Sequence, residues 1–171
     1  MRRIPAALAV GWVTLWLAGT EAEACGDKFL VVGRNVKRVP KARHPASILL
    51  YMRAGSQLPQ AAKEMRLEAT LRQAGHNVAV VAEDTLLRQQ LATGRYAFVL
   101  ADISDAAGLA RDVRSGPGAP EVVPVAYKAG EDAVRASQDA HALVIRAGKS
   151  LAYLFALDEA MGRREQAVAS R

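Results

Sequence analysis

The chain has 171 residues, of which 51% are hydrophobic and 23% are charged, and lysine plus arginine outnumber aspartate plus glutamate by 23 to 17, for a net charge of +6. This composition is that of an ordinary globular protein, and it excludes wholesale disorder and collagen-like repeats. The single cysteine excludes an internal disulfide, a C-x-x-C redox motif and a thiolate zinc site.

The first 24 residues have the pattern of a secretory signal peptide. A basic start precedes an uncharged, mostly apolar run over residues 4–19, and Ala22 and Ala24 place small side chains at a cleavage site. The run is shorter than the ~20 residues of a membrane-spanning helix. We therefore expect cleavage after Ala24, before Cys25, and export to the periplasm. An uncleaved anchor and lipid attachment at Cys25 are the less favoured alternatives.

Residues 25–45 form a basic extension ahead of the regular structure. Its cationic and potentially cationic residues lie between positions 34 and 44: Arg34, Lys37, Arg38, Lys41, Arg43 and His44. One alternative is a patch that binds anionic lipid, surface polysaccharide or an acidic protein. The other is a solvated linker between the N-terminus and the domain. Export and the absence of interleaved aromatic residues argue against nucleic acid as a partner.

Beyond residue 45, short apolar runs alternate with segments rich in helix formers. We expect strands over residues 47–51, 78–81, 96–100, 122–126 and 142–145. Helices are expected over residues 59–74, from Asp84 to Gly94, from Ser104 or Asp105 to Val113, over 131–139, and from Ser150 to about Gln166. Because the strands are continuously apolar, both faces of a parallel sheet should be covered. The sequence predicts a three-layer α/β sandwich over residues 46–166, followed by a tail over 167–171.

The segment Tyr96-Ala-Phe-Val-Leu-Ala-Asp102-Ile-Ser resembles the third strand of a two-component response-regulator receiver domain. In that family an aspartate at this strand end accepts a phosphoryl group. Pro124-Val125 and residues 140–147 are also similar to receiver motifs, with Arg146 where the family has a lysine. The resemblance covers roughly residues 46–162. It implies the flavodoxin-like fold, with five parallel strands in the order 2-1-3-4-5.

The positions that receivers use around the phosphoryl group differ in this chain. Receivers end their first strand with two acidic residues, whereas Met52 and Arg53 stand there in this sequence. The family's fourth strand ends in serine or threonine, but Tyr127 and Lys128 occupy that place. Without paired carboxylates there is no oxygen cage for Mg²⁺, and the charge on a transferred phosphoryl group is not neutralised. We expect no phosphotransfer, no metal and no cofactor.

If Asp102 does not accept a phosphoryl group, its side chain should have a structural role. The resemblance brings Arg53 and Arg146 toward it, so we expect Asp102 to form an ion pair with one of them. The alternative is an exposed strand-end aspartate that caps the following turn. The three histidines have no ligand spacing and are expected on the surface or in loops: His44, His76 and His141.

The leading functional hypothesis is an exported receiver-like domain, not an enzyme, that binds another protein in the cell envelope. A second hypothesis is a binder of small ligands or anions, in which Arg53, Asp102 and Lys128 meet at the strand ends. The third is a retained phosphoacceptor at Asp102 that works with Mg²⁺ in signal transduction.

Overall fold

A computed structural model of the chain describes residues 39–113, 119–148 and 150–170. The expected signal peptide, the cleavage site between Ala24 and Cys25, and the basic residues Arg34, Lys37 and Arg38 lie outside the described residues. Among the residues described, no helix combines the length and the hydrophobicity that a membrane crossing requires.

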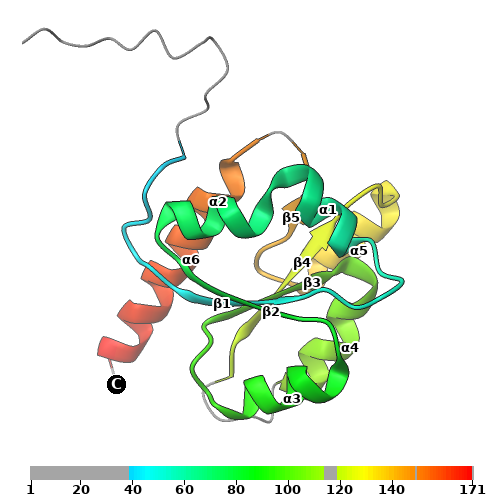
Figure 1. The fold of residues 1–171 in the computed structure, drawn as a ribbon. Coiled ribbons are helices and arrows are strands. Elements are labelled where there is room, and N and C mark those ends of the chain that lie inside the picture. The colour runs from blue at the N-terminus through cyan, green and yellow to red at the C-terminus, as the bar shows by residue number, and fades with distance from the viewer. Residues whose placement is uncertain (1–38, 114–118, 149, 171) are drawn as a thin grey trace, which may run out of the picture. The chain divides into compact units, whose positions relative to one another are not determined.

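Five parallel strands form one sheet in the order β2-β1-β3-β4-β5, as predicted (Figure 1). The strands are β1 (Ser47–Tyr51), β2 (Asn77–Val81), β3 (Phe98–Asp102), β4 (Glu121–Ala126) and β5 (Ile145–Arg146). In β1, Leu49 is in register with Ala79 on one side and with Val99 on the other. This strand order is that of the flavodoxin-like doubly wound fold, in which ligands bind at the carboxyl ends of β1 and β3, where the order reverses.

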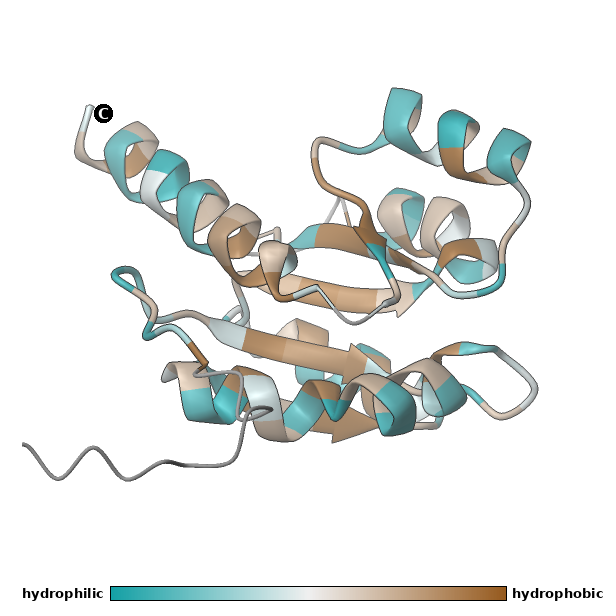
Figure 2. Cartoon of the chain, turned by 90° about the horizontal axis from the view of Figure 1, so that it is seen from above, coloured by the Kyte–Doolittle hydropathy of each residue, from teal (hydrophilic) through white to brown (hydrophobic). Residues whose placement is uncertain are grey.

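Helices cover both faces of the sheet and make a three-layer sandwich (Figure 1). On one face lie α1 (Leu58–Met65), α2 (Leu67–Ala74) and α6 (Ala152–Ala169). On the other lie α3 (Asp84–Ala92) and α4 (Ile103–Val113), with α5 (Glu131–Ala140) beside α4. Figure 2 shows hydrophobic strands between helices that carry hydrophilic residues, as expected for a sheet that is buried on both faces.

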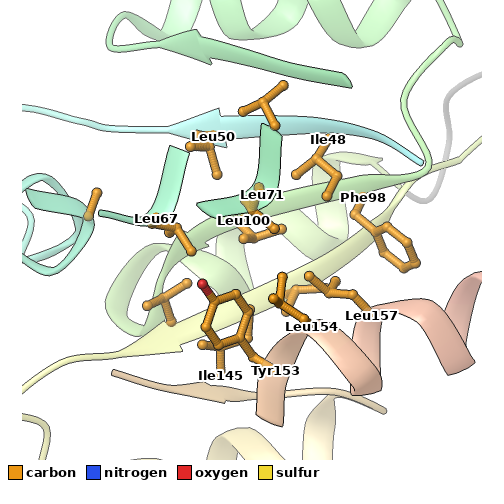
Figure 3. Packing of buried hydrophobic residues seen from close by; sticks show 14 of the residues in the cluster. Ile48, Leu50, Leu67, Leu71, Phe98, Leu100, Ile145, Tyr153, Leu154 and Leu157 are labelled. Carbon is orange, nitrogen blue, oxygen red and sulfur yellow. The ribbon is translucent and has the colours of Figure 1, made fainter. Parts of the chain in front are cut away.

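Alternate residues of each strand belong to the two sides of the core. Ile48 and Leu50 of β1 pack in the cluster under α1, α2 and α6, which Figure 3 shows from close by. Leu49 and Tyr51 of the same strand pack in the cluster under α3 and α4. Both clusters contain fully buried, closely packed side chains, which fix the positions of the strand ends.

Several elements differ from the sequence-based expectation. The third strand is Phe98–Asp102 and not 96–100, and α6 continues to Ala169 through most of the tail expected over 167–171. The single helix expected over residues 59–74 is divided at Arg66, which adopts a left-handed conformation at φ 51° between α1 and α2. The strand expected over 142–145 is reduced to Ile145–Arg146, which pair with Val125 and Ala126 of β4. The part of β4 up to Pro124 therefore has no strand partner on the β5 side, which agrees with the edge-like environment that a proline needs.

The described part of the basic extension, residues 39–45, is bound to the domain, and we call it the arm. The backbone N–H of Ala42 donates to the carbonyl of Ala74 at 2.8 Å, and Lys41 Nζ donates to the carbonyl of Gln73 at 2.8 Å. The N–H of His44 donates to Asp158 Oδ1 on α6 at 2.7 Å. The solvated-linker alternative therefore does not describe residues 41–44.

Candidate functional site

The carboxyl ends of β1, β3 and β4 bring together most of the residues that the sequence singled out. Met52 and Arg53 follow β1, Asp102 ends β3, and Tyr127 and Lys128 follow β4. In a doubly wound sheet this edge is the ordinary place for a ligand or a reaction. The contacts of each side chain decide whether these residues form one site.

Both carboxylate oxygens of Asp102 are engaged within the domain. Oδ2 accepts a hydrogen bond from the backbone N–H of Gln57 at 2.8 Å. Oδ1 accepts two, from the backbone N–H of Ser104 at 2.9 Å and from its hydroxyl at 2.7 Å. The residue is only 3% exposed. Asp102 therefore ties the loop after β1 to the beginning of α4.

The surroundings of Asp102 stabilise its negative charge without a cation. Gln57 directly precedes α1, and Ser104 lies in the first turn of α4, so two helices begin beside the carboxylate. The N-terminus of a helix carries a partial positive charge and unpaired N–H groups, both of which favour an anion. Three hydrogen bonds from these groups account for a buried carboxylate at this position.

The predicted ion pair between Asp102 and an arginine is wrong. Arg53 donates two hydrogen bonds to Asp105 instead, one of them from Nε to Oδ2 at 3.1 Å, and Asp105 raises the pKa of Arg53. Arg146 pairs with Glu131 at 3.3 Å on the surface. The capping alternative is confirmed by the bond to the Ser104 N–H, although Asp102 is buried and not exposed.

Asp102 has no arginine partner because Arg53 pairs with Asp105 instead. Asp102 is the last residue of β3, where its side chain turns toward the N–H groups of two helix starts. Asp105 lies in the first turn of α4, three residues after Asp102, and its carboxylate is reached by the partly exposed Arg53 side chain. The Arg53 guanidinium is therefore bound at Asp105, near the surface, and not at the buried Asp102 carboxylate.

The remaining residues of the predicted site also have other partners. Met52 packs against the core cluster under α1, α2 and α6. Lys128, in a left-handed conformation at φ 50°, lies over the Tyr127 ring at 4.8 Å from its centroid. Tyr127 Oη donates to Glu64 Oε1 at 2.5 Å, which lowers the pKa of Glu64. Lys128 thus belongs to a contact with α1 and not to an open site at Asp102.

The described residues also lack a metal centre at this edge. No three histidine, cysteine, aspartate or glutamate side chains in that part of the chain are grouped so as to hold an ion. The carboxylates nearest the receiver-like position, Asp102 and Asp105, are each engaged by donors of the protein itself.

A groove between α3 and α4 opens at the same edge of the sheet, with a volume of about 670 Å³. Its apolar lining comes from both helices: Leu87, Leu91, Leu109 and Val113. Charged side chains of both signs line it as well: Arg53, Asp84, Arg88, Asp105 and Asp112. At its mouth Tyr51 donates a hydrogen bond to Asp84, and burial together with this bond raises the pKa of Tyr51 to about 12.

Sequence reasoning missed this groove because its leucines have the helical spacing of ordinary core residues. The groove depends on how α3 and α4 lie relative to each other on the sheet, and no local sequence pattern indicates that arrangement. Tyr51, Asp84 and Asp105 were missed for a related reason, since each acts through a partner 33 or 52 residues away in the chain.

His76 is a second omission. We expected a surface or loop histidine, but the residue is only 4% exposed and its Nδ1 accepts the backbone N–H of Ala46 at 3.1 Å. The loop position is as expected, since His76 lies in the connection between the end of α2 and the start of β2. The surface position is wrong, because this connection passes under the arm and buries the ring. Its position directly before a strand was the one sequence signal of burial.

Comparisons of the chain with protein-family models, with curated proteins and with solved structures found no match. The strand order establishes the fold type, but a fold of this kind supports many unrelated functions. A functional conclusion has to come from the contacts of the site.

Proposed function

We propose that the chain is a receiver-like binding domain without phosphotransfer activity, which binds another protein in the cell envelope through the groove between α3 and α4. The observation that carries the proposal is the state of Asp102. A phosphoacceptor must present a free carboxylate oxygen to its phosphodonor. Both oxygens of Asp102 are used by Gln57 and Ser104, and the residue is 3% exposed.

The residues around Asp102 support the same conclusion. Mg²⁺ in a phosphoryl-transfer site is held by oxygen ligands that neutralise the developing charge. Met52 is turned into the core, and the Arg53 cation is bound by Asp105. A cation that is already paired contributes little to a transferred phosphoryl group, and Asp102 and Asp105 already accept hydrogen bonds from the protein.

The groove supports binding of a protein segment. Leucines from two helices form an apolar lining, and acidic and basic side chains border it. This combination of an apolar centre and a charged rim is typical of protein interfaces. The apolar side chains form the floor of the groove, where Leu87, Leu109 and Val113 are already largely buried in the domain. An extended or helical segment of a partner would pack on this floor and meet Asp84, Arg88 and Asp112 at the rim.

Gly108 offers a direct test of this surface. It lines the groove from α4, and a Cβ built there has no neighbour within 4 Å. Gly108→Arg therefore places a long side chain in the groove without disturbing the core. Ala107→Arg is the matched control, because the exposed Ala107 is adjacent on the same helix and does not line the groove.

Chemical cross-linking in the native envelope, followed by identification of the captured proteins, compares the two variants with the wild type. We expect the wild type and Ala107→Arg to capture the same protein, and Gly108→Arg to lose it while its thermal stability stays near that of the wild type. Equal capture by Gly108→Arg would contradict binding through the groove.

A thermal-shift experiment distinguishes the other hypotheses. Mg²⁺ with beryllofluoride, which imitates a phosphorylated aspartate, is expected to leave the melting temperature unchanged. Stabilisation by this pair would favour a phosphoacceptor. Stabilisation by phosphate or sulfate alone would favour a binder of small anions at the strand ends.

A further inference from the structure

A second pocket, of about 400 Å³, lies between the arm, the end of α2 and α6. We call it the arm pocket. Lys41, Arg43 and His44 line it from the arm, and Phe155 and Asp158 line it from α6, with His76 in its wall. The volume is in the range of small-molecule sites. The arm pocket is separate from the groove between α3 and α4, since the two share no lining residue.

His76 leaves one buried donor in this wall without a partner. Because Nδ1 accepts the N–H of Ala46 at 3.1 Å, the proton of the neutral ring is on Nε2. Burial lowers the pKa of His76, which keeps the ring neutral. Nε2 is buried and has no hydrogen-bond partner among the described residues. A buried N–H without an acceptor destabilises the folded protein, and a ligand oxygen that accepts from it would remove this cost.

An acceptor of hydrogen bonds also lies in the pocket. Asp158 Oδ1 accepts the backbone N–H of His44 at 2.7 Å, and within the described part of the chain its Oδ2 has no hydrogen bond. The carboxylate is close enough to His76 for its charge to oppose the lowering of the histidine pKa. The arm pocket therefore presents an N–H donor and a carboxylate acceptor near each other.

An exposed aromatic ring completes the lining. Phe155 is 64% exposed, which is unusual for a phenyl ring, and it borders the pocket next to the buried Leu154. The charged side chains of the lining largely offset one another: Arg163 is paired with Glu159 at 2.8 Å, and Asp158 lines the pocket together with the arm cations Lys41 and Arg43. The site is suited to a ligand with an apolar face and little net charge.

The chemistry of the lining narrows the ligand class. A purely apolar molecule would leave the His76 N–H unpaired. A carboxylate or phosphate could accept from this N–H but has no proton to donate to Asp158. A hydroxyl group both donates and accepts hydrogen bonds. We propose that the arm pocket binds a neutral saccharide, with one hydroxyl oxygen accepting from His76 Nε2, a second hydroxyl donating to Asp158, and the apolar face of the sugar ring on Phe155.

Gly162 allows the arm to approach closely enough to form this pocket. A Cβ at this position of α6 would lie 3.2 Å from His44 Nε2. The His44 ring is held there by Glu165, with Nδ1 2.7 Å from Oε2. The arm therefore passes over α6 at a point where any larger residue would require the histidine ring to shift by a few tenths of an ångström.

The test is an NMR titration of the full chain with methyl α-glucoside, N-acetylglucosamine and galactose, followed at the imidazole resonances of His76 and the ring of Phe155. We expect a saturable shift with at least one sugar, and none with acetate or phosphate. Phe155→Ala should weaken binding at least tenfold. Val168→Ala should not, because Val168 is an exposed apolar residue on the same helix outside the pocket.

His76→Asn retains an acceptor for the Ala46 N–H but lacks the Nε2 donor, so it should also weaken binding at least tenfold. Three outcomes would overturn the proposal: no saturable shift with any of the sugars, saturation by phosphate or acetate instead, or affinities unchanged by Phe155→Ala. Since Phe155 is exposed, its replacement leaves the fold intact, and the titration remains decisive even if His76→Asn is unstable.

Discussion

Replacing Asp102 with asparagine changes the charge and hydrogen bonding of the buried carboxylate with almost no change in shape. In the wild type, one oxygen accepts from Gln57 and the other accepts twice from Ser104. The asparagine amide has only one oxygen. Its best orientation keeps that oxygen on Ser104 and turns the NH₂ group toward the N–H of Gln57, where two donors face each other.

The expected cost follows from this geometry. Asp102→Asn loses one hydrogen bond to a charged acceptor and leaves the Gln57 N–H unpaired, for about 1.5–3 kcal/mol. Asp102→Ala loses all three hydrogen bonds and should cost about 3–5 kcal/mol. Ser104→Ala removes only the hydroxyl bond of 2.7 Å and should cost about 1 kcal/mol.

Equilibrium unfolding in urea at pH 7, followed by far-ultraviolet circular dichroism, measures the three values. The order Ser104→Ala, Asp102→Asn, Asp102→Ala, from smallest to largest loss, is expected. If Asp102→Asn were within about 0.5 kcal/mol of the wild type, as for an ordinary surface substitution, the carboxylate would not be holding the two helix starts.

Three further predictions concern the glycines and the buried rings. Gly108→Ala places a methyl group in open space on a helix and should raise the free energy of unfolding by about 0.5–1 kcal/mol, measured in thermal melts. Gly162→Ala brings a methyl group to 3.2 Å from the His44 ring and should give no such gain; equal gains in the two variants would contradict the close approach of the arm. Because burial and a carboxylate partner raise the pKa of Tyr51 from 10.0 to about 12, stability should fall as the pH rises from 10 to 12, and Tyr51→Phe should flatten that fall in urea midpoints. Burial lowers the pKa of His76 from 6.5, so the unfolded state takes up the proton first and the free energy of unfolding should fall as the pH drops below 6.5. The same dependence of stability on pH in His76→Asn would refute this.

The sheet could be predicted from the sequence because its strands are continuous apolar runs separated by helix formers. Ile48-Leu49-Leu50 is apolar at every position, and the register with β2 and β3 buries each of these side chains. The division at Arg66 could not be predicted, since a left-handed non-glycine residue costs about 1–2 kcal/mol and the surrounding residues favour helix. Only the packing of α1 and α2 on the sheet offsets that cost.

The candidate site was predictable in position but not in its contacts. The apolar run predicted a strand that ends at residue 100, and the resemblance to receiver domains placed Asp102 at the strand end, where the structure has it. The sequence did not reveal that Gln57 and Ser104 reach the carboxylate before Arg53 does. The pairing depends on the path of the loop over residues 52–57 and on Asp105 in the first turn of α4, which binds the same arginine.

Intact-mass measurement after incubation with acetyl phosphate and Mg²⁺ tests the central claim most directly, namely that Asp102 is a structural residue and not a phosphoacceptor. The closed hydrogen bonding of its carboxylate predicts an unmodified mass for the wild type, equal to the result without Mg²⁺. A phosphoryl adduct that forms with Mg²⁺, is released by hydroxylamine and is absent from Asp102→Asn would contradict it.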